Sequence, residues 1–275
     1  MEETLNHSSS PFKKIIDLIE TLRGENGCPW DQKQTPLSMT RYLVEETFEL
    51  MDAIHSDNIE DICEELGDVL FLVLFLAVQF QSSGLFNIKT LVQHNLDKMI
   101  RRHPHVFGEG TAHTPEQVRD RWHAIKREEK SHQQDHTILG TVPKSLPALM
   151  RAHRISERAA RSGFDWDDIN GVMKKAQEEW GELKQELKND QKDTGSREAL
   201  ELEIGDVLFT LVNVARLAGI HPETALASST RKFESRFNTM EKLAKERQTF
   251  FEKLSYNDKH RLWDEVKKSE KNGSY

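Results

Sequence analysis

Apolar residues recur at helical spacing along most of the chain, and no stretch keeps the apolar–polar alternation of a β-strand. Over 38–55, for example, Met39, Leu43 and Ile54 fall on one side of a helical wheel. The most apolar run, Val69 to Val78, is about half of the ~20 residues that a membrane-spanning helix needs. We therefore predict an all-α protein in which this run is a buried core helix, and we expect no association with a membrane.

The predicted helices repeat in the same order, so the chain reads as one unit copied twice. Residues 164–166 of the second copy also resemble residues 29–31 of the first copy. A polar segment with Gly140 and Pro143 separates the copies and is typical of a linker. We predict an N-terminal domain at 11–128, a linker at 129–146 and a C-terminal domain at 147–270. Within them, helices are expected at about 12–22, 38–55, 58–81, 88–103 and from 114, and then at 148–163, 171–188 and 197–218, with two more after these.

An acidic pattern occurs once in each copy, as E-E-x-x-E, a spacer, and E-x-G-D-V-L-F. Carboxylates three residues apart share a helix face, so each copy projects two acids from one helix and two from the next. Such a group repels itself unless a cation lies between its members, and its repetition argues against chance. The acids are Glu46, Glu49, Glu65 and Asp68 in the first copy and Glu179, Glu182, Glu203 and Asp206 in the second.

These acids lie along the apolar stripes of their helices, and not on a solvated face. Glu46 falls between Leu43 and Leu50, and Glu179 falls between Ala176 and Leu183. An unpaired carboxylate in such a position is costly or takes up a proton. Oxygen ligands without nearby cysteine favour a hard cation, so we predict Mg²⁺, with Mn²⁺ as an alternative.

Basic and aromatic residues recur in register with the acids. A single Lys/Arg pair is more often a surface salt bridge, and a single Trp is more often a core residue. Their recurrence beside an acidic group favours a polyphosphate site, because the cations neutralise phosphoryl oxygens while the acids hold metal. The repeated residues are Lys98, Arg102, Trp122 and Lys126 in the first copy and Lys232, Arg236, Trp263 and Lys267 in the second.

Composition limits the alternatives. The net charge of −8 argues against direct nucleic-acid binding, although it leaves anionic substrates open where a cation mediates. Two cysteines provide no disulfide framework, and the first residues lack the apolar core of a signal peptide. We therefore expect a cytoplasmic protein.

The chain resembles the MazG family of nucleoside triphosphate pyrophosphohydrolases. The resemblance rests on CPWDQKQT, YLVEETFEL, EELGDVLF, KFESRF and the late W-D-E-V-K, and it extends over about residues 11–268. It implies two tandem four-helix-bundle-type domains that pair into homodimers. It also implies Mg²⁺-dependent cleavage of NTPs and dNTPs to a nucleoside monophosphate and pyrophosphate, with broad base tolerance.

The family pattern also implies roles for the repeated residues, position by position. The second copy is expected to be the main site, although its spacer between acidic pairs is longer than that of the first copy. There Glu179 and Glu182 would be the catalytic carboxylates, one of them as general base, with Lys232 and Arg236 as catalytic cations. All eight acids would be metal ligands, and substrate contacts would come from Lys232, Arg236, Trp263, Lys267, Lys98, Arg102, Trp122 and Lys126.

Two other functions fit the same residues. One is a non-catalytic, metal-stabilised helical dimer that binds nucleotides or a regulatory protein. The other is a narrower pyrophosphatase that acts on dUTP, dCTP or a phosphoribosyl-ATP-like compound.

Overall fold

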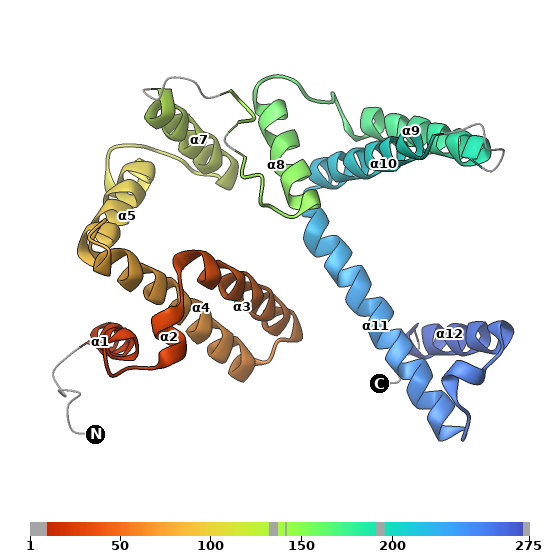
Figure 1. Ribbon diagram of the computed structural model, residues 1–275. Coiled ribbons are helices and arrows are strands. Elements are labelled where there is room, and N and C mark those ends of the chain that lie inside the picture. Colours follow the sequence, from red (N-terminus) through yellow and green to blue (C-terminus); the bar gives the residue numbers. More distant parts are fainter. Residues whose placement is uncertain (1–9, 132–136, 141, 191–195, 272–275) are drawn as a thin grey trace. The chain divides into compact units, whose positions relative to one another are not determined.

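The computed structural model describes residues 10–131, 137–140, 142–190 and 196–271, and within these ranges it contains helices and no strand (Figure 1). The all-α prediction is confirmed for this part of the chain. The chain divides into two compact units, residues 1–132 and 133–275. The predicted domain boundaries stay a prediction, and parts of the predicted linker and of the spacer between the acidic helices of the second copy lie outside the described residues.

Unit 1 contains every helix predicted for the first copy and two short helices outside the predicted ranges. The short helices are α2 and α6, and each begins at a proline, which suits the first helical position because it needs no amide donor there. The helices are α1 (Pro11–Arg23), α2 (Pro29–Lys33), α3 (Pro36–Ser56), α4 (Ile59–Ser82), α5 (Ile88–Arg102), α6 (Pro104–Phe107) and α7 (Pro115–Ser131). The last of these continues into the range that we predicted as linker.

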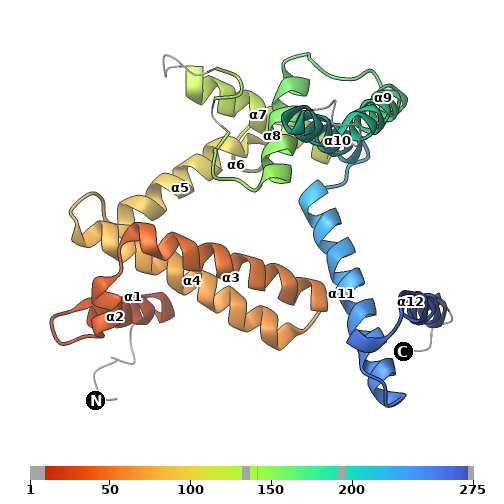
Figure 2. The ribbon, with the colours of Figure 1, turned by 45° about the vertical axis from the view of Figure 1, so that its right-hand side comes forward.

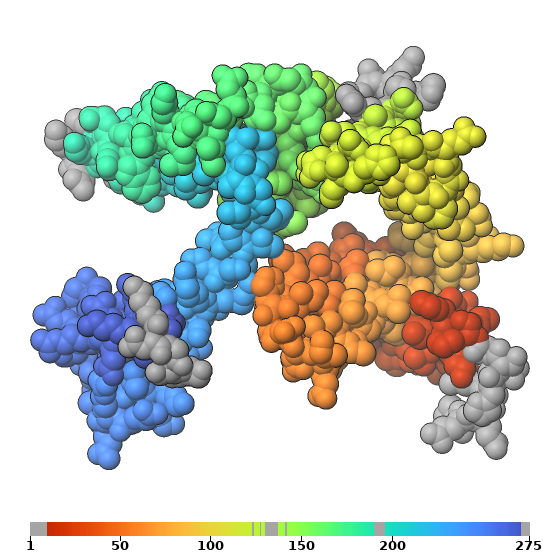
Figure 3. Space-filling view, turned by 180° about the vertical axis from the view of Figure 1, so that it is seen from behind, coloured from red at the N-terminus to blue at the C-terminus, as the bar shows by residue number. Residues whose placement is uncertain are grey.

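The centre of unit 1 is the pair α3 and α4, which lie side by side, with α1 packed on α4 and α5 leading away from the end of α4 (Figure 2). A capping box between Thr35 and Ser38 starts α3, and the Asn58 side chain accepts a hydrogen bond from the Glu60 amide to start α4. Asp57, with φ of 58°, makes the tight turn between them. In the space-filling view, the side chains of α3 and α4 (orange) form one continuous mass (Figure 3). The turn at Asp57 fixes how the acids of α3 and α4 face each other.

The core of unit 1 is apolar. It buries residues of α1, α3 and α4. On α4, Leu72 and Phe75 follow Glu65 and Asp68 by seven residues, so the buried side chains continue the side of the helix that carries the acids. Ile54, which we placed on the apolar side of its helix, is 54% exposed because it lies near the open end of α3. The buried cluster consists of Ile19, Met39, Leu72, Phe75 and Val78.

Unit 2 repeats this arrangement around α10. The pair α9 and α10 lies at its centre (Figure 1), α8 packs on α10 as α1 packs on α4, and α11 leads away from α10 as α5 leads away from α4. The last helix packs against α11 around a separate cluster of Met240, Ala244, Leu262 and Val266. The elements are α8 (Ala148–Arg161), α9 (Ile169–Asp190), α10 (Arg197–Leu217), α11 (Pro222–Glu246), the 3₁₀ turn η1 (Phe251–Lys253) and α12 (Tyr256–Lys271).

The two units differ in the polarity of their central helices. Where α4 buries Leu72, Phe75 and Val78, the repeat register places Thr210, Asn213 and Arg216 on α10. The Arg216 guanidinium is ion-paired with Asp165, and this pairing lowers the pKa of the Asp165 carboxyl. The Asn213 side chain also accepts a hydrogen bond from Arg216 at 3.3 Å. Unit 2 is therefore held together partly by a polar network at positions that are apolar in unit 1.

Both acidic helix pairs leave large apolar side chains in contact with solvent. Within the described residues, no single helix is long and apolar enough to cross a membrane. The helices α10 and α11, which meet at a bend of 103°, are together long and apolar enough by length and composition alone. Contiguous exposed apolar surface on a helix pair is typical of an interaction face. Residues at least 42% exposed on these pairs include Val44, Phe48, Leu66, Val73, Met173, Trp180, Leu187, Leu202, Leu208, Phe209 and Leu211.

Candidate functional site

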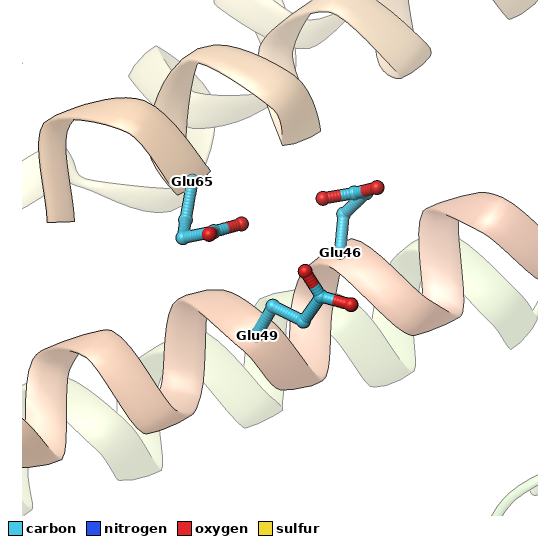
Figure 4. A group of neighbouring side chains, drawn as sticks. All are labelled: Glu46, Glu49 and Glu65. Carbon is cyan, nitrogen blue, oxygen red and sulfur yellow. The ribbon is translucent and has the colours of Figure 1, made fainter. Parts of the chain in front are cut away.

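Three of the four predicted acids of the first copy come together between α3 and α4. Glu46 and Glu49 lie one turn apart on α3, and Glu65 faces them from α4 (Figure 4). One carboxylate oxygen from each residue lies within 4.8 Å of those of the other two. Glu46 and Glu65 are half-buried and Glu49 is exposed, so the cluster opens to solvent on one side. We call it the N-terminal acid cluster.

The N-terminal acid cluster contains mutually repelling charges. Burial, followed by the charge of Glu49, raises the pKa of Glu46 and of Glu65. Ionised carboxylates only accept hydrogen bonds, so Glu46 and Glu65 bond to each other only when one of them holds a proton. In the ionised state the Oε2 atom of Glu65 is buried and has no hydrogen-bond donor. A cation would supply the missing partner.

The second copy forms the same arrangement, which we call the C-terminal acid cluster. Glu179 and Glu182 lie on α9 and Glu203 lies on α10, again with ligand oxygens within 4.8 Å of one another. Glu179 is 7% exposed, and the buried Oε2 atom of Glu203 has no hydrogen-bond partner. Glu203 occupies the repeat position of Glu65. The same carboxylate is thus left unsatisfied in both copies.

A lysine distinguishes the C-terminal acid cluster. Lys175 Nζ lies 2.9 Å from an oxygen of Glu179 and 2.9 Å from an oxygen of Glu178. The hydrogen bond to Glu179, followed by that to Glu178, raises the pKa of Lys175 above its usual range. Burial raises the pKa of Glu182, while the charge of Lys175 opposes this effect. The equivalent position in the first copy is Tyr42, which brings no charge.

The fourth predicted acid of each copy lies outside these groups of three. Asp68 and Asp206 are both exposed, each one turn along the helix from the clustered glutamate. Asp68 still contributes to raising the pKa of Glu46 and Glu65, which indicates that it lies near the N-terminal acid cluster. Their role as metal ligands stays a prediction.

The predicted substrate residues of the first copy meet between α5 and α7. The Arg102 guanidinium and the Lys126 ammonium lie 5.1 Å and 4.9 Å from the centre of the Trp122 ring, within cation–π range. Lys98 lies one turn before Arg102 on α5 and is half-buried. Arg102 Nε also donates a hydrogen bond to Glu129 at 3.1 Å, and this pairing with Arg102 is the main cause that lowers the pKa of Glu129 to about 2.

The second copy builds the same group between α11 and α12. The Arg236 guanidinium lies 5.5 Å from the centre of the Trp263 ring, and the Phe233 ring lies 5.4 Å from it. Arg236 is ion-paired with Glu270 at 2.7 Å, which lowers the pKa of the Glu270 carboxyl. Lys232 and Lys267 flank these residues on the same two helices and are exposed, which suits a contact with an anion.

Among the described residues, the acids and the basic–aromatic groups lie on different helix pairs. The acids lie on α3 with α4 and on α9 with α10, whereas the basic–aromatic groups lie on α5 with α7 and on α11 with α12. The charges that shift the pKa values of Glu46, Glu65 and Glu182 come from other acids and, in the second copy, from Lys175. Within each unit, the described residues thus form the two halves of the predicted site on separate helix pairs.

Sequence reasoning missed three side chains that shape these groups. Lys175 had a simple signal, because a lysine four residues before a glutamate on a helix is placed to pair with it. Glu129 and Glu270 had a repeat signal, since each follows its tryptophan by the same spacing as in the other copy. We had assigned Glu129 to the linker, whereas it lies on α7 and pairs with Arg101 and Arg102.

Comparison with known proteins matches this chain to one family. The model of the MazG nucleotide pyrophosphohydrolase domain matches twice, at residues 34–107 and 168–241, and each match contains one acid cluster and one Lys/Arg pair. A nucleoside triphosphate pyrophosphohydrolase of Escherichia coli K12 is 39% identical over 94% of this chain and 97% of its own length. A nucleoside triphosphate pyrophosphohydrolase/pyrophosphatase MazG of Thermotoga maritima is 40% identical over 93% of this chain and 95% of its own length. Because the family model covers both acidic helix pairs and these relatives span nearly the whole chain, this protein belongs to the MazG family, with two MazG domains in tandem.

Proposed function

We propose that this protein is an enzyme that hydrolyses nucleoside triphosphates, both NTPs and dNTPs, to a nucleoside monophosphate and pyrophosphate, with Mg²⁺ at its acid clusters. The observation that carries the proposal is the pair of equivalent buried oxygens, Glu65 Oε2 and Glu203 Oε2, that lack a hydrogen-bond partner in both copies. The relatives named as nucleoside triphosphate pyrophosphohydrolases support the reaction class.

The donor set fits a hard divalent cation. Each acid cluster offers three carboxylates within 4.8 Å of one another, with no histidine or cysteine in the group. Oxygen ligands open to solvent on one side suit Mg²⁺, which keeps several waters and binds substrate phosphates together with a few carboxylates, and Mn²⁺ accepts the same ligands. When bound, the ion neutralises phosphate charge and makes a bound water more acidic. Asp68 and Asp206 would complete the two clusters from the neighbouring turn.

The protein residues then have distinct tasks. Glu179 is buried and ion-paired with Lys175, whereas Glu182 is exposed to solvent. One of the two accepts the proton of the water that attacks phosphorus, and the bridging P–O bond breaks to release pyrophosphate. Lys232 and Arg236 bind the phosphoryl oxygens, with Arg236 aligned by Glu270. Trp263 and Lys267 contact the rest of the nucleotide, and Lys98, Arg102, Trp122 and Lys126 do the same in the first copy.

The active form is proposed to be a homodimer. Both acidic helix pairs expose large apolar residues, and burying this surface against the same surface of a second chain is energetically favourable. Within each unit the basic–aromatic group and the acid cluster lie on different helix pairs, and a dimer offers a way to bring the two kinds of group together. Nucleoside triphosphates are the proposed substrates, and we propose a cytoplasmic location without direct nucleic-acid binding.

Metal removal tests the proposal directly. Purified protein with a panel of eight NTPs and dNTPs should release pyrophosphate in Mg²⁺, lose this activity in EDTA, and regain it when Mg²⁺ or Mn²⁺ is added in excess. Hydrolysis of most members of the panel would support broad base tolerance, while hydrolysis of dUTP or dCTP alone would favour a narrower pyrophosphatase. Nucleotide binding without pyrophosphate release would favour a non-catalytic module, and full activity in EDTA would refute the metal site.

A further inference from the structure

An aromatic pair lies beside the N-terminal acid cluster. The rings of Trp30 on α2 and Tyr42 on α3 meet edge to face, with centroids 5.5 Å apart and planes inclined at 64°. Tyr42 precedes Glu46 by one helical turn, so the two side chains share a face of α3, roughly 6 Å apart along its axis. The pair is thus on the same side of α3 as the acid cluster.

The position of Trp30 is fixed by the fold, although the side chain itself is 50% exposed. The Trp30 carbonyl accepts a hydrogen bond from the Gln34 side chain at 3.1 Å, and the next carbonyl, that of Asp31, accepts one from Arg23 at 2.8 Å. Tyr42 in turn packs against the buried core of unit 1. The indole is therefore a large aromatic surface that is held in place while half of it faces water.

The second copy lacks this arrangement. Lys175 stands at the register position of Tyr42, and it is already paired with Glu179 and Glu178. Trp166, the counterpart of Trp30, lies next to Gly171, where an added Cβ would be 3.6 Å from the indole. Trp166 has no aromatic ring partner among residues 142–189, whose side chains the structure describes.

We propose that Trp30, positioned by Tyr42, is a nucleobase-stacking subsite of the N-terminal acid cluster. This inference rests on the proposed function, because it requires that the cluster holds the triphosphate of a nucleotide through a cation. A base offers a π-face that stacks on an indole whatever its identity, so the subsite discriminates a nucleotide from a base-free polyphosphate. Trp30 is thereby a specificity residue for this copy.

The experiment compares two ligands in the full chain with Glu182→Gln and Glu203→Gln in place, so that the C-terminal acid cluster is disabled. Binding of α,β-methylene ATP, whose α,β linkage resists hydrolysis, and of inorganic triphosphate is measured by calorimetry in Mg²⁺. Trp30→Ala should weaken binding of the ATP analogue about 10-fold and leave that of triphosphate within about 2-fold. Trp30→Phe should recover most of the loss, and Trp166→Ala, the matched control, should change neither ligand.

Two results would overturn the subsite while leaving the proposed function intact. One is unchanged binding of the ATP analogue by Trp30→Ala, and the other is equal weakening of both ligands, which would show that Trp30 supports the fold of the cluster. A parallel thermal melt identifies the second case. A different result would refute the proposed function of this cluster, and the subsite with it. This result is that the chain with Glu182→Gln and Glu203→Gln but with Trp30 intact fails to bind inorganic triphosphate in Mg²⁺.

Discussion

The two acid clusters have the same carboxylates but different neighbours one turn before the first of them. In the C-terminal acid cluster Lys175 reaches Glu179 at 2.9 Å, whereas in the N-terminal acid cluster the equivalent side chain is Tyr42, in contact with Trp30. The lysine compensates part of the negative charge of its cluster. In the part of the chain that the structure describes, the charges that shift the pKa values of Glu46 and Glu65 are all acidic, and burial together with the charge of Glu49 raises the pKa of Glu46. The C-terminal acid cluster is therefore partly neutralised by the protein itself, and we expect the N-terminal acid cluster to depend more strongly on an added ion.

This difference indicates how a duplicated site can diverge without losing its ligands. The clustered glutamates are set by helix spacing and by the turn between two helices, so both copies keep them. The residue one turn earlier is free to change, because it alters the charge and shape around the cluster without altering its geometry. We expect the C-terminal acid cluster, with Glu179 buried and ion-paired, to be the main hydrolytic site.

The largest expected effect separates the copies by catalysis. Glu179→Gln should reduce NTP hydrolysis by at least ~100-fold, because it removes a charge that the site needs to bind metal and stabilise the transition state. The matched Glu46→Gln should reduce it less. Initial rates of pyrophosphate release at saturating Mg²⁺ measure both variants. If Glu46→Gln abolished activity and Glu179→Gln left it intact, the ranking of the two copies would be reversed.

The acids were predictable from sequence, whereas their neighbours were only partly so. Glu46 with Glu49 and Glu179 with Glu182 are one turn apart, so helix periodicity alone places them together. The short turn at Asp57 brings Glu65 opposite them, and a helical hairpin was implied by the spacing. These are local relationships, and local rules are reliable for them.

Contacts between distant segments were harder to predict. The pairing of Arg102 with Glu129 joins α5 and α7, which are separated in the sequence by α6 and a loop. Nothing in the sequence pointed to this contact, because we predicted that Glu129 begins the polar linker that contains Gly140 and Pro143. The contact of Trp30 with Tyr42 depends on α2, which lies outside the helix ranges that we predicted. Tertiary packing decides such positions, and spacing alone does not record it.

A smaller effect is expected on stability. The pKa of Glu46 and of Glu65 is raised in the folded protein, so the folded state binds protons more readily than the unfolded state above the usual value of 4.5. The stabilisation of the folded state that comes from this proton binding is complete below pH 4.5. It is lost as the pH rises through the pKa values of Glu46 and Glu65 in the folded protein. In EDTA, the melting temperature of unit 1 in the full chain should therefore fall by a few degrees, roughly 2–5 °C, from pH 5 to pH 8.

Glu65→Gln provides the control for this pH dependence. It removes one of the repelling charges, so in EDTA it should flatten the decline and melt at or above the unsubstituted protein at pH 8. Groups that the substitution leaves unchanged contribute equally in both proteins and cancel in the difference, and the pKa of Glu129, about 2, lies below this pH range. Excess Mg²⁺ should abolish the difference in slope by binding the ionised cluster. Parallel curves for the two proteins in EDTA would show that Glu65 does not bear the proposed repulsion.

The smallest effect tests the lysine itself. Lys175 and an incoming divalent cation both interact with the Glu179 carboxylate, so removing the lysine should favour the metal. In a chain whose N-terminal acid cluster is disabled by Glu46→Gln and Glu65→Gln, Lys175→Met should tighten Mg²⁺ binding by about 2–5-fold, the range expected for a partly exposed ion pair. Lys174→Met, which removes the adjacent exposed lysine, is the matched control and should have a smaller effect. Calorimetric Mg²⁺ titrations measure the affinity of both variants. Equal affinities of Lys175→Met and Lys174→Met would mean that Lys175 does not compensate the charge of the C-terminal acid cluster. The contrast between Lys175 and Tyr42 would then be one of shape and not of charge.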